Sequence, residues 1–180
     1  MRTAVLGLLV CVLFSCETSK QNTIQYIDTK ALFKDVIERL SAEHKTLQKT
    51  LIFGDSSVTQ NLSMVNWESE LKPFIEIDLL KNAYKGRYKA DTLQSENSIK
   101  VTYTPLDAKT DLNELVITLS KPGNSLQFLN ASFVTNNTLY EATKELNYYA
   151  DSLFTISGTQ QVQLGNNVTY KITGIITEGQ

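Results

Sequence analysis

Histidine and cysteine, the side chains most often used for nucleophilic catalysis and zinc binding, are scarce in this sequence. The 180 residues include one histidine, His44, and two cysteines, Cys11 and Cys16. A histidine- or cysteine-rich metal site needs several such residues at metal-ligand spacing. The sequence also has no phosphate-binding loop, dinucleotide fingerprint, HExxH or GxSxG motif. We therefore predict no catalytic, cofactor-binding or metal-binding residue, and we do not expect an enzyme.

His44 is the one residue on which a Ser-His-Asp type of catalysis could depend. It falls on the apolar face of a predicted helix and has no partner nearby in the sequence. A lone histidine in that position is more often packed at the edge of the core than catalytic. A hydrolase that uses His44, with an acid brought close by folding, remains the remote alternative.

Two groups of charged residues invite a functional interpretation. Glu76 and Asp78 could form a carboxylate pair, but residues two apart on a helix do not face each other. Lys85, Arg87 and Lys89 alternate along a predicted strand, and Lys100 could join them across the strand pair. They would form a basic ladder that could meet lipid headgroups or an anionic partner. The simpler interpretation of both groups is a solvated surface.

The overall charge argues against a nucleic-acid partner. Seventeen basic and nineteen acidic residues give a net charge of -2. Nucleic-acid binding needs a concentrated positive footprint to neutralise phosphates. Hydrophobic residues make up 42% of the chain and charged residues 20%. This composition is typical of an ordinary globular domain.

The N-terminus carries the most specific pattern in the sequence. Arg2 precedes an uncharged apolar run at residues 4–14, which is too short to span a membrane as a mature helix and is typical of a secretory signal peptide. The run ends in Leu13-Phe14-Ser15-Cys16. This tetrapeptide resembles the lipobox of bacterial lipoproteins, in which the cysteine thiol receives diacylglycerol before cleavage on its N-terminal side. We therefore predict cleavage between Ser15 and Cys16, and lipidation of Cys16.

Lipidation would fix the location of the protein. Each buried methylene contributes about 0.8 kcal/mol, so two or three acyl chains hold a protein on a membrane essentially permanently. Glu17 follows the cysteine. In lipoproteins of this type an aspartate at that position is common in inner-membrane members, so Glu17 favours the outer membrane. We expect a cell-envelope lipoprotein that faces the periplasm.

Hydrophobic spacing then divides the mature chain into elements. Residues 17–26 are polar and lack periodicity, so we expect residues 16–27 to form the lipidated tether and residues 28–180 to form a single domain. Apolar residues recur at intervals of three and four over 29–48 and again over 66–82, which predicts two amphipathic helices. Asp28 or Thr29 can cap the first helix, and Pro73 is expected to bend the second. Between them, residues 49–53 and 57–63 flank Gly54-Asp55-Ser56 and predict a hairpin.

From Tyr84 onward the hydrophobic period changes to two, which predicts half-buried antiparallel strands separated by short turns. Seven strands follow one another as a meander. Gly86, Gly158 and Gly174 fall on the inward-facing positions, where a glycine marks strong curling or the close approach of another group. The predicted fold is α+β, with two N-terminal helices packed against a curved antiparallel meander of about seven strands.

This arrangement resembles a group of small lipoproteins of Gram-negative bacteria to which no activity is assigned. The resemblance rests on the lipobox at Cys16, on the segment Asn66-Trp67-Glu68-Ser69-Glu70-Leu71-Lys72-Pro73-Phe74 and on Lys85-Gly86-Arg87-Tyr88. The group more often has aspartate at the position of Asn66, which keeps the capping chemistry. The resemblance implies a fold and a location, but no activity.

The function expected from the sequence is that of a membrane-anchored, non-enzymatic partner-binding or structural module. Its partner would be another envelope protein if the helices fill the sheet. If the curved sheet instead leaves a cavity, the protein would carry a lipid or another apolar ligand, and the sequence has many tyrosines that could line such a groove.

Overall fold

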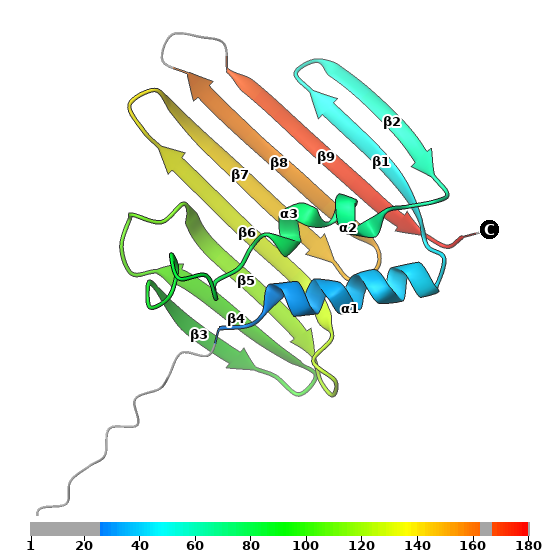
Figure 1. Cartoon of the computed structure of the whole chain (residues 1–180), viewed down its shortest axis with the longest axis horizontal. Coiled ribbons are helices and arrows are strands. Elements are labelled where there is room, and N and C mark those ends of the chain that lie inside the picture. Colours follow the sequence, from blue (N-terminus) through cyan, green and yellow to red (C-terminus); the bar gives the residue numbers. More distant parts are fainter. Residues whose placement is uncertain (1–25, 163–166, 180) are drawn as a thin grey trace, which may run out of the picture.

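The computed structural model describes residues 26–162 and 167–179. In this part of the chain nine strands form one open sheet, and three helices lie against one of its faces (Figure 1). The helices are α1 (Thr29–Ala42), α2 (Trp67–Glu70) and α3 (Lys72–Ile75). The strands are β1 (Thr46–Phe53), β2 (Ser56–Leu62), β3 (Tyr88–Gln94), β4 (Ser98–Pro105), β5 (Leu112–Ser120), β6 (Leu126–Asn136), β7 (Tyr140–Tyr149), β8 (Leu153–Val162) and β9 (Val168–Thr177).

The predicted α+β class is confirmed, but the sheet is larger than predicted. Strands β3 to β9 follow one another as a seven-stranded antiparallel meander. The predicted hairpin, β1 and β2, does not stand apart, because β1 pairs with β9 along its whole length. The strand order is therefore β2-β1-β9-β8-β7-β6-β5-β4-β3, and β2 and β3 are the two edges.

The first helix is shorter than the predicted range of 29–48. It begins at Thr29, where the Asp28 side chain accepts a hydrogen bond from the Ala31 N–H, and it ends at Ala42. Phe33, Val36 and Leu40 make its buried stripe. The apolar spacing beyond residue 42 suits a strand as well as a helix, and pairing with β2 and β9 places Leu47 in β1.

The second predicted helix, 66–82, forms as two short helices followed by turns. The Asn66 side chain accepts a hydrogen bond from the Ser69 N–H and starts α2, as the sequence predicted. Pro73 has no N–H to donate to the Ser69 carbonyl, so the helical hydrogen bonding is interrupted near Leu71 and α3 starts anew. Trp67, Leu71 and Phe74 are all buried.

The helices cover part of one face of the sheet with an aromatic core. The Phe33 ring of α1 lies 5.4 Å from the Phe74 ring of α3 and 5.2 Å from the Tyr148 ring of β7, measured between centroids. Phe74 also meets Phe154 of β8 edge-on at 6.1 Å. Offset and edge-on contacts at these distances stabilise aromatic pairs beyond their buried area.

Two of the three glycine predictions are confirmed. A Cβ at Gly174 would collide with the Phe154 ring, and a Cβ at Gly158 would lie 2.7 Å from the Tyr170 ring. In both places an aromatic ring lies across the glycine of the neighbouring strand. The prediction for Gly86 is wrong. It lies in the loop before β3 with a φ of 72°, so it serves a turn that suits glycine.

We predict that Phe74→Ala lowers the free energy of unfolding by about 3–5 kcal/mol, because it removes a fully buried ring from the contact between helices and sheet. Met64→Ala is the control, because Met64 is 93% exposed, and it should change stability by less than about 0.5 kcal/mol. Both values come from chemical denaturation. A loss below about 1 kcal/mol for Phe74→Ala would show that this ring is not part of a tightly packed core.

Candidate functional site

His44 does not lie on a helix as predicted. It is exposed in the turn between α1 and β1, with a φ of 51°. The His44 N–H donates to the Ser41 carbonyl, and the Lys45 N–H donates to the Leu40 carbonyl. This pair of bonds is the Schellman motif, which ends a helix with one residue in the left-handed conformation. His44 thus occupies the position that glycine most often takes.

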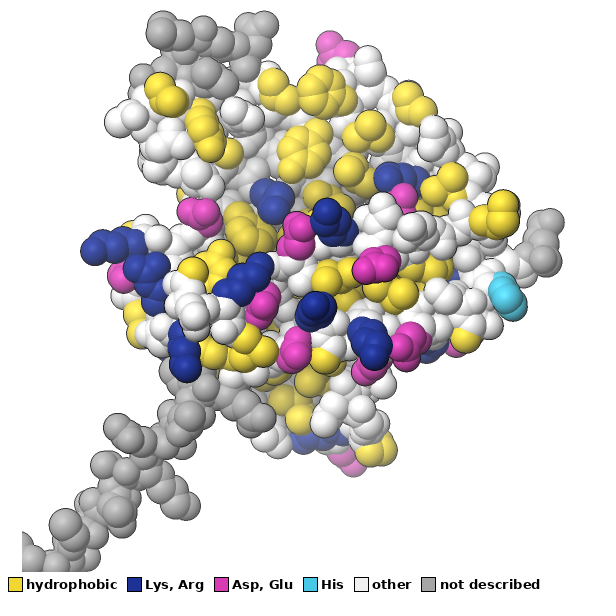
Figure 2. All heavy atoms as spheres, in the orientation of Figure 1, with side chains coloured by type: hydrophobic (Ala, Val, Ile, Leu, Met, Phe, Trp, Pro, Cys, Tyr) yellow, Lys and Arg dark blue, Asp and Glu magenta, His cyan; other side chains and the backbone are white. Residues whose placement is uncertain are grey.

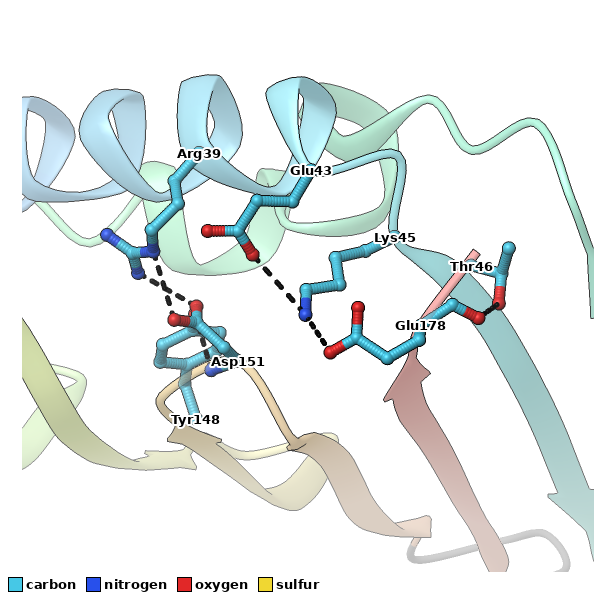
Figure 3. A network of polar contacts seen from close by, with 7 residues as sticks. All are labelled: Arg39, Glu43, Lys45, Thr46, Tyr148, Asp151 and Glu178. Carbon is cyan, nitrogen blue, oxygen red and sulfur yellow. Dashed lines mark hydrogen bonds and ion pairs between the residues drawn. The ribbon is translucent and has the colours of Figure 1, made fainter. Parts of the chain in front are cut away.

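No catalytic arrangement surrounds His44 in the part of the chain that the structure describes. His44 lines an open hollow of about 620 Å³ with Ser63 and Glu178, among others. The Glu178 carboxylate is engaged by the Lys45 ammonium group (Figure 3). Among the described residues no serine hydroxyl or carboxylate forms a hydrogen bond with the imidazole, so the hydrolase alternative gains no support from this geometry.

Glu70, Glu76 and Asp78 each have a separate partner and form no carboxylate pair. Glu70 makes an ion pair of 2.7 Å with Lys49 of β1, and Glu76 lies 3.9 Å from Lys72. The Asp78 carboxylate accepts a hydrogen bond from the Leu80 N–H. The Glu70–Lys49 ion pair joins α2 to the sheet, and the other two contacts join residues that are close in the sequence.

The basic ladder also differs from the prediction. Strand β3 begins at Tyr88, so Lys85 and Arg87 lie in the preceding loop and only Lys89 belongs to the strand. Lys100 pairs with Leu93, four residues beyond Lys89 along β3. The cations therefore cluster at one end of β3 and do not extend along it.

A bidentate ion pair that the sequence did not indicate joins α1 to the sheet. Arg39 Nε and Nη2 donate to the two Asp151 carboxylate oxygens at 2.9 and 2.8 Å, and the Tyr148 hydroxyl donates to Asp151 Oδ1 at 3.2 Å (Figure 3). The hydrogen bond to Asp151 raises the pKa of Arg39, and burial raises the pKa of Tyr148. Arg39 is therefore charged and Tyr148 neutral at neutral pH. Both groups serve to position the helix.

The tyrosines divide between the core and the surface. Tyr88, Tyr103 and Tyr148 are fully buried, and burial raises the pKa of each of them. Tyr84 and Tyr170 line a surface hollow of about 400 Å³ with Phe133 and Lys144. The Lys144 ammonium lies 4.5 Å from the centre of the Phe133 ring. Tyr88, Tyr103 and Tyr148 therefore belong to the core, whereas Tyr84 and Tyr170 remain accessible at the hollow.

The most unusual surface lies where the sheet extends beyond the helices. Side chains of β1 alternate, so Leu51 and Phe53 share the face on which Leu47 is buried. Leu51 pairs with Val58 of β2 and with Ile172 of β9, and Phe53 pairs with Tyr170. We call this surface the open apolar face, made of Leu51, Phe53, Val58, Tyr170 and Ile172. Leu51 is 41% exposed, and Phe53 and Val58 are each 56% exposed.

The open apolar face ends at an unusual edge strand. Among the described residues β2 has no neighbour on its outer side, and Ser56–Leu62 contains no charged residue and no proline. All its residues except Leu62 are exposed. Proteins normally protect an edge strand with charges, proline or a bulge. The other edge, β3, does carry charges, Lys89 and Asp91. Figure 2 shows hydrophobic side chains gathered on the part of the sheet that the helices leave uncovered.

The lipobox prediction concerns Ser15 and Cys16, which lie outside the described residues. Within the described part of the chain, no group of histidine, cysteine or acidic side chains could hold a metal ion. No helix in the same part of the chain is long and apolar enough to cross a membrane. The open apolar face and edge β2 therefore remain as the candidate site.

Comparisons with known proteins add no family assignment. No protein-family model matches the chain, and no curated protein or solved structure matches it. The case for a function thus depends on the site itself.

We predict that His44→Gly raises the free energy of unfolding by about 0.5–1 kcal/mol, because glycine adopts the left-handed conformation without the Cβ clash. His44→Ala is the matched control. Alanine keeps the Cβ and should give no such gain, and urea denaturation measures both variants. A less stable glycine variant would contradict the role of His44 as the residue that ends α1.

Proposed function

We propose that this protein is a non-enzymatic binding module, held at a membrane through lipidated Cys16, that takes up an extended segment of another polypeptide along β2. One observation carries the proposal. The apolar face of the sheet continues past the helices that cover it and reaches a free, uncharged edge strand. An edge of this kind can accept an additional strand.

The chemistry of the edge defines its partner. A strand added to β2 would form main-chain hydrogen bonds with the unpaired groups of the edge, and every second side chain would point toward the open apolar face. Phe53 and Val58 would contact these side chains. Because Ser56–Leu62 carries no charge, a charged segment would lose hydration without gaining an ion pair. The expected guest is a neutral segment with alternating apolar residues.

A lipid or apolar-ligand carrier is the second candidate. The hollow of about 400 Å³ beside Phe133, Tyr170 and Lys144 favours it, because the hollow joins apolar rings to a cation. That volume falls in the range of small-ligand pockets. Against it, the protein's own helices fill the covered part of the sheet, where Phe33, Phe74 and Tyr148 are fully buried. We therefore rank the polypeptide partner first.

The location proposed for this module is the cell envelope, in the periplasm-facing leaflet of the outer membrane. The lipobox and the length of the apolar run support it. We predict that Cys16→Ala leaves the protein either unprocessed or released from the membrane, because no acyl chain can be attached. Cell fractionation and the mass of the intact protein measure this. A cleaved variant that stays with the membrane would contradict lipid anchoring.

The proposed binding edge can be tested with a photoreactive residue. We predict that benzoylphenylalanine at Val58 crosslinks in native envelopes to one polypeptide, whereas the same residue at Leu93 does not. Leu93 is the matched control because it is 70% exposed on the other edge strand, β3. Thr59→Lys should abolish the crosslink, because it places a charge on the free edge.

The alternatives predict other outcomes for the same experiment. Crosslinking of Val58 to a lipid, together with near-stoichiometric lipid in mass spectra of protein purified from its host, would favour the carrier. Crosslinking to a second copy of this chain would show that the guest segment belongs to another copy of the protein. Equal crosslinking at Val58 and Leu93, or none at Val58, would overturn the proposal.

A further inference from the structure

We infer that the edge of the sheet where the chain enters the domain rests on anionic phospholipid headgroups, in the leaflet that holds Cys16. The surface consists of Lys81, Lys85, Arg87 and Lys89, with Leu80 and Leu106 beside them. We call it the entry edge. The inference rests on the proposed lipidation of Cys16, and it adds which edge of the anchored domain faces the membrane.

The first described residues place the entry point beside β3 and β4. The Tyr26 hydroxyl donates to the Tyr88 carbonyl at 3.3 Å, and the Ile27 N–H donates to the Tyr103 hydroxyl at 3.0 Å. Ten residues separate Cys16 from Tyr26, and ten residues of fully extended chain span at most about 35 Å. The entry edge is therefore the part of the domain with the least distance to cover before it reaches the membrane.

The entry edge has an excess of positive charge that its own residues do not neutralise. Residues 80–91 contain four cations and one acid, and the adjoining residues 106–111 contribute one cation and two acids, which leaves a net charge of +2. In the part of the chain that is described, Lys85 and Arg87 form no ion pair, and Lys81 donates to the Glu76 carbonyl. Lys89 lies 3.7 Å from Asp91, but both side chains are exposed, so water screens the pair.

The loop geometry holds these cations together. Gly86, with a φ of 72°, turns the chain between Lys85 and Arg87, and the Arg87 N–H donates to the Tyr84 carbonyl at 3.0 Å. Figure 2 shows Lys and Arg side chains gathered on the side of the molecule where the chain enters, at the left of the view. Lys and Arg near an anionic leaflet each add roughly 1 kcal/mol of attraction.

Exposed leucines beside the cations point to a lipid surface. Leu80 is 49% exposed and precedes Lys81. Leu106 is 62% exposed, and its N–H donates to the Arg87 carbonyl at 2.8 Å. Basic residues combined with accessible apolar side chains are typical of surfaces that lie in the membrane interface. An acidic protein partner would match the charge alone, whereas the anionic leaflet matches the charge, the leucines and the position of the anchor.

The test uses the acylated protein, purified from its host and reconstituted into vesicles. Leu106→Cys carries a bimane fluorophore, and headgroup spin-labelled lipid quenches it on contact. Met64→Cys is the control position, because it is 93% exposed and follows β2 at the opposite edge. Vesicles of phosphatidylethanolamine and phosphatidylglycerol at about 3:1 are compared with pure phosphatidylcholine, at low salt and at about 0.5 M salt, where charges are screened.

We expect quenching at position 106 but not at 64, on the anionic vesicles and at low salt only. Replacing Lys85, Arg87 and Lys89 by glutamine should lower the population in contact about tenfold or more. Replacing Lys45, Lys49 and Lys171 by glutamine removes the same charge from β1, from β9 and from the turn before β1, on the other side of the sheet, and should leave the quenching unchanged. Circular dichroism and thermal melting of every variant check that the domain is folded.

The outcomes separate this inference from the anchoring that it requires. Protein that floats with the vesicles, but shows equal quenching at positions 106 and 64, is anchored without resting on the entry edge, and overturns the inference alone. Equal loss of quenching in both glutamine variants would overturn it too, because net charge and not the entry edge would then be responsible. Protein that does not float with any vesicle overturns both the anchoring and the orientation.

Discussion

The packing of Phe33 and Phe74 onto Tyr148 and Phe154 is the interaction on which the rest of the structure depends. It joins elements far apart in the sequence, namely α1, α3 and the two strands near the middle of the sheet. A large antiparallel sheet with two accessible faces buries little apolar surface by itself, so a layer of helices on one face must supply the core. The Arg39–Asp151 ion pair then sets the position of α1 on the sheet.

The size of this helical layer determines what stays uncovered. The helix α1 crosses the strands (Figure 1) and is about 10 Å wide, whereas a ten-residue strand such as β9 is about 33 Å long. α2 and α3 have four residues each and add little cover. The layer is therefore too small for the sheet, and the apolar side chains of β1, β2 and β9 beyond it remain accessible. The candidate site is a direct consequence of this mismatch in area.

The two edges of the sheet differ in a way that suits a protein held at a surface. β3 borders the point where the chain enters and follows the loop that carries most of the cations, while β2 is neutral and lies at the opposite edge. With the entry edge on the membrane, β2 would point away from it. The anchor and the proposed binding edge would then not compete for space, and a guest strand could approach from the aqueous side.

The sequence by itself determined the features that depend on neighbouring residues. The alternation of apolar and polar side chains predicted the meander, Asp28 and Asn66 predicted the starts of the helices, and the turn at Gly54 predicted the hairpin. These predictions were possible because periodicity, caps and turns are local properties. The inward positions of Gly158 and Gly174 were also readable from alternation.

Only the tertiary structure decided the rest. The strand that β1 joins is β9, more than a hundred residues away, and the apolar residues that stay uncovered depend on where the helices pack on the sheet. Leu47 and Phe53 look alike in the sequence, yet one is buried under the helices and the other is 56% exposed. The Arg39–Asp151 pair spans 112 positions and has no sequence pattern. Local spacing fixes the face on which a side chain lies, and only the packing of distant elements determines what covers that face.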